Sequence, residues 1–154
     1  QDLSNVIPPG YATFDDPAQA PLADTRELLV HAYYISTSSS AATGYPALRR
    51  KTLTAGPDIG DEEIIAGVED LQFQVGVDTD ADSQTDAFVN PGAVPATAKP
   101  VSVRIWLRLR SQERDNAYTD DQAVIYADRT VDASGDHFRR LLVMKTLQLR
   151  NSGS

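Results

Sequence analysis

The chain contains no cysteine, so disulfides, thiol nucleophiles and cysteine metal ligands are excluded within these 154 residues. It also lacks any apolar run approaching the ~18 residues that cross a bilayer. No secretory signal peptide is recognisable at its start. If the native protein is exported or membrane-bound, we therefore expect the responsible segment to lie outside this chain.

Positive charge is scarce in the middle of the chain. Residues 52–98 hold no Lys or Arg and ten Asp or Glu, whereas residues 99–150 hold ten basic and seven acidic residues. The net charge of −8 argues against nucleic acid as a partner, because phosphate binding needs clustered Lys and Arg. The asymmetry predicts either docking between these two parts or contacts with partners of opposite charge.

The length and a hydrophobic content of 41% predict one folded domain. Residues 1–27 hold four of the nine prolines and are predicted to form an irregular N-terminal arm. Residues 28–151 are predicted to form a β-rich domain, and residues 152–154 a disordered tail. The predicted fold is mainly β, with one or two layers of antiparallel sheet. The predicted strands are 28–37, 47–54, 68–77, 101–111, 123–128 and 141–150.

Two segments carry specific expectations about local structure. Residues 27–37 (ELLVHAYYIST) are nearly continuously apolar, which favours a strand buried on both faces. Asp61–Ala66 begins with three acidic residues, which favour the positive end of a helix dipole. We therefore predict a short helical turn there, ended by Gly67.

The clearest strand is residues 101–111 (VSVRIWLRLRS), which alternates between an apolar face and a face with Arg and Trp. The second face is the arginine row, made of Arg104, Trp106, Arg108 and Arg110. Trp and Arg are enriched at binding hot spots, so the row is a candidate docking surface for an acidic neighbour. Two alternatives remain open: an exposed sheet face with Trp106 covered by arginine stems, or pairing with the acidic middle of this same chain.

Several segments, in this order, resemble the C-terminal half of PilW-type minor pilins of the type IV pilus. They are AYYIS (32–36), PALRRKTL (46–53), IIAGVEDLQFQVGVDTDADS (64–83), PVSVRIWLRLRS (100–111) and RRLLVMKTLQLRN (139–151). Their order is also similar to that of the J-type minor pseudopilin of type II secretion. The chain departs from the PilW pattern at Val75, where an aromatic residue is common, and at Arg49, where tyrosine is common.

The resemblance implies a pilin-like C-terminal domain of a larger α+β protein whose N-terminal helix is outside the chain. It implies a non-enzymatic subunit that assembles with other minor pilins and pilus assembly or tip proteins to prime the pilus, at its tip. It places the protein in a Gram-negative bacterium, first anchored in the inner membrane with a periplasmic domain and then in the extracellular filament. Adhesion and twitching motility are the associated processes, and the truncated domain could form a homodimer through a sheet edge.

Two alternative functions remain open. One is a minor pseudopilin of type II secretion, and the other is a secreted β module that binds calcium or carbohydrate. The sequence preceding Gln1 would discriminate them, because a pilin requires a prepilin leader and a ~20-residue apolar helix.

The stretch GVDTDADSQTD, residues 76–86, is the candidate metal site. Its oxygen ligands at alternate positions could converge on one calcium ion, with Gln84 contributing its backbone carbonyl. The five candidate ligands are Asp78, Asp80, Asp82, Gln84 and Asp86. Ser83 and Val89 occupy the glycine and glutamate positions of an EF-hand, so that motif is excluded. A solvated acidic turn is the alternative, since aspartate favours turns. No cofactor is required, and calcium would be structural.

Catalytic motifs are not found in the sequence. His31 and His137 are far apart and neither has a catalytic motif around it. His31 is expected to lie in or at the edge of the core, and His137 in a solvated turn. Glu69 and Asp70 would point to opposite faces of a strand, which makes them a poor acid–base pair. We therefore predict that the chain is not an enzyme and has no catalytic residues.

Overall fold

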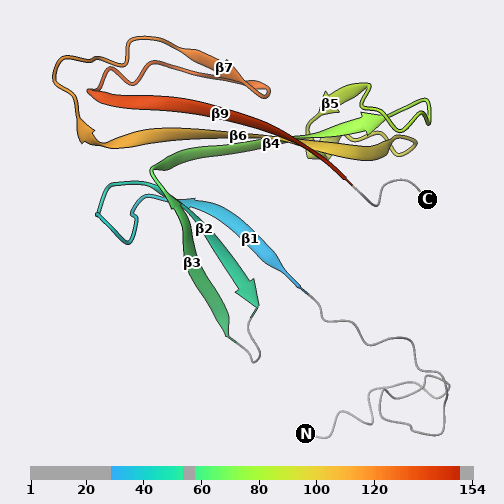
Figure 1. Cartoon of the computed structure of the whole chain (residues 1–154), viewed down its shortest axis with the longest axis horizontal. Coiled ribbons are helices and arrows are strands. Elements are labelled where there is room, and N and C mark those ends of the chain that lie inside the picture. The colour runs from blue at the N-terminus through green and yellow to red at the C-terminus, as the bar shows by residue number, and fades with distance from the viewer. Residues whose placement is uncertain (1–28, 54–57, 150–154) are drawn as a thin grey trace, which may run out of the picture. The chain divides into compact units, whose positions relative to one another are not determined.

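The computed structural model describes residues 29–53 and 58–149, and its strands form antiparallel sheets (Figure 1). The described strands all lie within one compact unit, His31–Ser154. The strands are β1 (His31–Ser36), β2 (Ala47–Leu53), β3 (Ile59–Ala66), β4 (Val68–Asp78), β5 (Ala87–Val89), β6 (Lys99–Arg114), β7 (Val124–Tyr126), β8 (Arg129–Val131) and β9 (Phe138–Gln148).

The mainly β prediction is confirmed, and each of the six predicted segments overlaps an observed strand. The structure adds β3, β5 and β8, and it starts the last strand three residues earlier, at Phe138. The predicted arm (residues 1–27) and tail (residues 152–154) lie outside the described residues.

Sheet A has the strand order β1-β2-β3, with antiparallel neighbours. The predicted helical turn at Asp61–Ala66 is wrong, because this segment lies within strand β3. Its acidic residues instead face the basic residues of β2 across the sheet. Arg49 pairs with Asp61 at 3.0 Å, and Arg50 pairs with Glu62 at 2.9 Å. Cross-strand charge pairs of this kind outweigh the weak helical preference of a short acidic segment.

The exposure of β1 corrects a second expectation. The first three residues of β1 are exposed and the last three are half-buried, so the strand is not buried on both faces. β1 is an edge strand of sheet A, and Tyr33 retains 52% of its surface. The continuous apolar run therefore predicted the strand correctly but not its exposure. Alternation of apolar and polar residues indicates which face of a strand is buried, and this run does not alternate.

Sheet B has the order β5-β4-β6-β9, and β7 and β8 form a separate two-stranded ribbon. The register of β6 places Phe73 of β4 and Lys145 of β9 on either side of Ile105. It likewise places Gln72 and Met144 on either side of Trp106. Because side chains alternate along a strand, one face of sheet B is apolar and the other carries the arginine row.

Gly67 lies between β3 and β4, where the chain leaves sheet A and enters sheet B. Its N–H donates to the Pro46 carbonyl at 2.6 Å, and its carbonyl accepts from the Arg110 N–H at 2.7 Å. Its φ of +85° is left-handed, and an added Cβ would lie 3.0 Å from the Arg110 carbonyl oxygen. Glycine therefore fits a junction that needs both a positive φ and a close backbone approach.

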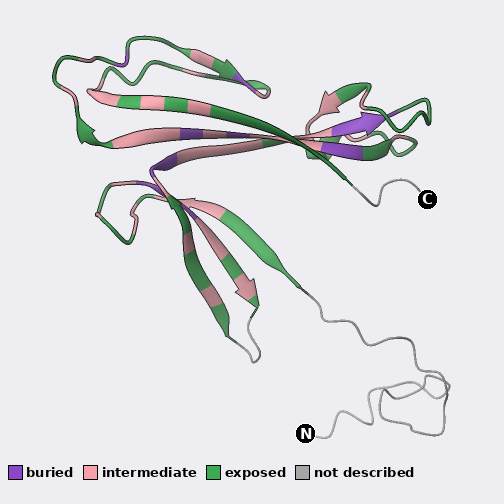
Figure 2. Ribbon diagram, in the orientation of Figure 1, coloured by how far each residue is buried: buried purple, intermediate pink, exposed green. Residues whose placement is uncertain are grey.

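The largest fully buried side chains lie near the ends of the central strands of sheet B. They are Val68 and Val77 in β4 and Val101 and Ser102 in β6. Figure 2 shows how little of the described chain is buried and how much of β9 is exposed. The two faces of sheet B therefore carry the features with functional potential.

Candidate docking surfaces and the aspartate loop

The aspartate loop, residues 78–86, joins β4 to β5 and is organised around one buried carboxylate. Asp78 is 3% exposed and accepts the backbone N–H groups of Asp80, Ala81 and Ser83 at 3.1, 2.7 and 2.8 Å. Ala81 and Ser83 adopt φ values of 69° and 67°, which turn their N–H groups inward. Burial raises the pKa of Asp78, but the three N–H donors lower it, and the net pKa lies below its ordinary value.

The five predicted calcium ligands do not all come together. Asp78, Asp80 and Asp86 each offer a carboxylate oxygen within 4.8 Å of the others. Asp82 is occupied differently, because it accepts the backbone N–H and the side-chain amide of Gln84, both at 2.7 Å. The loop is held by its own N–H groups around a carboxylate that is buried rather than solvated, and calcium binding stays a prediction.

Replacing Asp78 with Asn is expected to lower the melting temperature, because three N–H donors then lose a charged acceptor. The pH dependence has a definite sign. The pKa of Asp78 is lower in the folded than in the unfolded state, so its carboxylate contributes its full stabilisation at pH values above the unfolded pKa of ~3.9. This stabilisation is lost as the pH falls through the folded pKa. Thermal melts of both proteins between neutral and acidic pH measure the difference, which should shrink at low pH.

Asp82→Asn is the matched control, since Asp82 is exposed and bonds only its immediate neighbours. Equal melting temperatures for both variants at neutral pH would contradict the structural role of Asp78. The same melts with millimolar calcium test the metal site. A calcium-induced rise in melting temperature that Asp80→Asn abolishes would support the calcium site. An unchanged melting temperature would exclude it.

The arginine row on β6 is largely enclosed by the described chain. Trp106 is 7% exposed and Arg108 8%. The Arg104 guanidinium lies 3.5 Å from the centre of the Phe88 ring and donates to the Thr146 hydroxyl at 3.2 Å. The exposure that the docking interpretation requires is therefore missing at Trp106 and Arg108. A docking role for the row stays a prediction.

Arg108 takes part in a largely buried ion cluster on the same face of sheet B. The cluster consists of Glu69, Arg108, Arg110, Asp120, Asp136 and Arg140. Arg140 lies at its centre, with its guanidinium 2.8 Å from Glu69, 3.0 Å from Asp120 and 2.6 Å from Asp136. Its side chain is 9% exposed. Only Glu69 of this cluster comes from the acidic middle of the chain, whereas Asp120 and Asp136 belong to residues 99–150, so most of the pairing is within the C-terminal part itself.

The ion cluster attaches the connection between β6 and β9 to the sheet. Asp120 and Asp136 come from this connection, whereas Glu69 and Arg108 come from β4 and β6. The Arg140 guanidinium lowers the pKa of Asp136 to about 2, and Asp136 in turn raises the pKa of Arg140. The pairing therefore keeps both groups charged at any physiological pH.

A second attachment joins the β7–β8 ribbon to β4. The Tyr126 hydroxyl donates to Asp70 at 2.5 Å, and Arg129 pairs with Asp70 at 3.3 Å. Burial together with the bond to Asp70 raises the pKa of Tyr126 to about 12. Sequence analysis did not identify Asp120, Asp136 or Arg140 as members of an ion cluster. The sequence shows no pattern that indicates which loop carboxylate lies next to which strand arginine.

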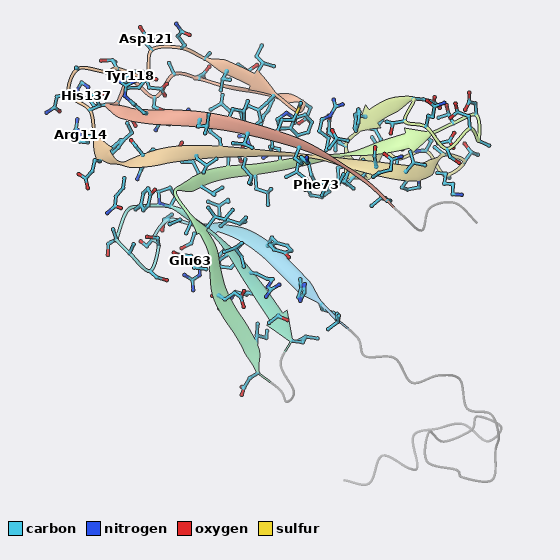
Figure 3. The ribbon with its side chains drawn as sticks, in the orientation of Figure 1. Glu63, Phe73, Arg114, Tyr118, Asp121 and His137 are labelled. Atoms are coloured by element: carbon cyan, nitrogen blue, oxygen red, sulfur yellow. The ribbon has the colours of Figure 1, made fainter. Side chains whose placement is uncertain are left out.

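The opposite face of sheet B is apolar and, among the described residues, incompletely covered. Its exposed members are Phe73 of β4, at 49%, and Leu141, Val143 and Leu147 of β9, at 62%, 41% and 47%. An apolar cavity of about 430 Å³ lies between this face and sheet A. It is lined by Tyr33, Leu48, Leu71, Phe73, Val103, Ile105 and Leu107, and Figure 3 labels Phe73.

The two histidines are not near each other in any described contact. His137 Nδ1 lies 2.6 Å from the Tyr118 carbonyl oxygen at the start of β9, where Figure 3 labels both residues. His31 contacts Tyr33 edge to face in the exposed first half of β1, so it is an edge residue. Neither histidine has a nucleophile or carboxylate bonded to it among the described contacts.

These observations define a class: a protein of antiparallel sheets with an incompletely covered apolar face, an ion cluster and an aspartate loop held by its own backbone. No helix among residues 29–53 and 58–149 is long and apolar enough to cross a membrane. A model of the PilW family, Type IV Pilus-assembly protein W, matches residues 32–151, and the chain belongs to that family. Comparisons with curated proteins and with solved structures gave no match. The chain is therefore involved in type IV pilus assembly and is associated with the cell envelope and pilus.

Proposed function

We propose that this chain is a minor pilin subunit that assembles with other minor pilins to prime the type IV pilus, at the filament tip. Its mechanism is complementary docking of surfaces, with no bond chemistry. The subunit is held in the inner membrane with this domain in the periplasm until it enters the filament. Family membership supports the pathway, and the apolar face of sheet B is the observation that carries the docking mechanism.

The apolar face suits this role because of its composition and position. Phe73 and the exposed leucines of β9 form a continuous surface with the cavity beside sheet A. Contiguous apolar surface exposed on a soluble domain marks an interaction site. A hydrophobic helix of a neighbouring subunit is the occupant that fits this face, since a helix can bury one apolar stripe along a sheet face.

Replacing Phe73 with Asp is expected to abolish piliation and the co-purification of other minor pilins. A charge at a half-buried apolar contact should cost about 2 kcal/mol or more of docking energy, or roughly 30-fold in affinity. The measurement is surface pilin and twitching in cells that carry the variant as the full-length protein. Ile125→Asp is the matched control, because Ile125 is 76% exposed on β7, in a separate sheet.

Thermal melts of both variants establish that they fold. Normal piliation with Phe73→Asp would contradict the docking mechanism. Normal piliation combined with loss of protein secretion would instead support the type II pseudopilin alternative.

A further inference from the structure

β9 is the outermost strand of sheet B, and among the described residues no strand pairs with its outer edge. The strand is eleven residues long, and its second half, from Val143 to Gln148, is exposed throughout. In Figure 2 this half of β9 is coloured as exposed. A long exposed edge strand presents unpaired backbone groups that can receive another strand.

The hydrogen bonding of β9 shows which backbone groups point outward. The Leu149 N–H donates to the Val101 carbonyl, and the register continues without a shift from Ser102 to Arg110. In an antiparallel pair, backbone groups alternate between pointing at the partner strand and pointing away. The N–H and C=O groups of Leu142, Met144 and Thr146 therefore point away from β6.

The side chains along this edge specify the chemistry of an added strand. Leu141, Val143, Lys145 and Leu147 share the apolar face of sheet B, so one lysine lies within an apolar row. Lys145 is exposed and forms no ion pair with any described residue. A strand that pairs here would gain most from apolar residues on the same face and a carboxylate opposite Lys145.

We propose that the outer edge of β9 is a strand-addition site for an extended segment of a partner protein, with an acidic residue opposite Lys145 and apolar residues two positions away on either side. Main-chain hydrogen bonds to Leu142, Met144 and Thr146 hold the added strand, and side-chain contacts with Val143, Lys145 and Leu147 select it. The proposal rests on the proposed function only for the identity of the partner, which would be another pilus protein.

A second copy of this chain is a poorer occupant. β9 contains Arg139, Arg140 and Lys145 but no acidic residue. Arg139 is neutralised by Asp115 at 2.6 Å, and Arg140 by the ion cluster, so Lys145 is the unpaired cation of the strand among the described residues. Antiparallel self-pairing centred near Met144 would bring two Lys145 side chains onto one face, where like charges repel.

The test uses the whole 154-residue chain and a synthetic peptide, Val-Thr-Val-Thr-Glu-Thr-Val-Thr-Val, with a second peptide in which Lys replaces Glu. Amide hydrogen exchange followed by NMR should show slower exchange of the Leu142, Met144 and Thr146 N–H groups when the Glu peptide is added. Lys145→Glu should weaken binding of the Glu peptide and strengthen binding of the Lys peptide, each by about two- to fivefold in affinity.

Met144→Pro should abolish binding, because proline removes an outward N–H while leaving the bonds to β6 in place. Protection of the Val143 and Lys145 N–H groups shows whether this variant keeps the β6–β9 pairing, and Lys145→Glu tests the site without proline. The proposal is overturned if neither peptide protects the three amides, if Lys145→Glu leaves peptide preference unchanged, or if protection arises from concentration-dependent dimerisation without peptide. This experiment contains no other pilus protein, so a negative result here does not bear on the Phe73→Asp test of the proposed function. A negative result in the Phe73→Asp test likewise does not bear on strand addition.

Discussion

Replacing Arg140 with Met is expected to reduce the free energy of unfolding by about 3–5 kcal/mol, the usual cost of removing one partner from a buried ion pair. The Arg140 side chain is 9% exposed and contacts Glu69, Asp120 and Asp136. Without it, Asp136 loses its ion pair with Arg140, and the remaining ion pair of Asp120 is the longer one to Arg108 at 3.5 Å. Urea denaturation of the variant and the parent chain gives the difference.

Arg129→Met is the matched control for this experiment. Arg129 also pairs with a carboxylate, that of Asp70, but its side chain is 47% exposed. Exposed pairs are screened by solvent and contribute roughly 0–1 kcal/mol, so this variant should remain close to the parent. If both variants lose a similar amount of free energy of unfolding, the burial of Arg140 does not make its ion pairs more stabilising than an exposed pair.

Replacing Trp106 with Ala is expected to destabilise the chain by about 3–5 kcal/mol, the range for large aromatic residues removed from a core. Trp106 is 7% exposed on β6, flanked in the register by Gln72 and Met144. The result discriminates between two roles of the arginine row. A core role predicts a large fall in stability, whereas a docking role predicts normal stability and weaker assembly.

Met144→Ala provides the comparison for Trp106, because Met144 is its direct cross-strand neighbour and 57% exposed. A change of about 0.5 kcal/mol or less is expected there. If Trp106→Ala unfolds at the same urea concentration as the parent chain, Trp106 does not stabilise the fold, and the result favours a docking role for the arginine row.

The strands could be predicted from the sequence because their evidence is local. The alternation in residues 101–111 identifies both the strand and its apolar face, and the register bears out that division. What covers each face could not be predicted in the same way. The row with Arg108 has the pattern of a wet or interface face, yet Asp120, from a loop after the strand, covers it.

Asp61 shows why local signals can mislead. Three consecutive acidic residues are a reasonable helix start in isolation, but Arg49 and Arg50 lie on the neighbouring strand and provide closer partners. The aspartate loop shows a different limit. Spacing predicted five convergent ligands, whereas the left-handed residues Ala81 and Ser83 turn the backbone N–H groups toward Asp78. No sequence pattern distinguishes an aspartate that binds a cation from one that binds its own loop.

The ion cluster has a consequence for the alignment of β9 with β6. Both faces of β9 are rich in apolar residues, since Leu142 and Met144 lie opposite Leu141 and Val143. Hydrophobicity alone therefore distinguishes weakly between the observed alignment and one displaced by a single residue. A displacement would move Arg140 to the apolar face and leave three carboxylates without their central cation. The ion cluster therefore favours the observed alignment of β9 with β6 over one displaced by a single residue.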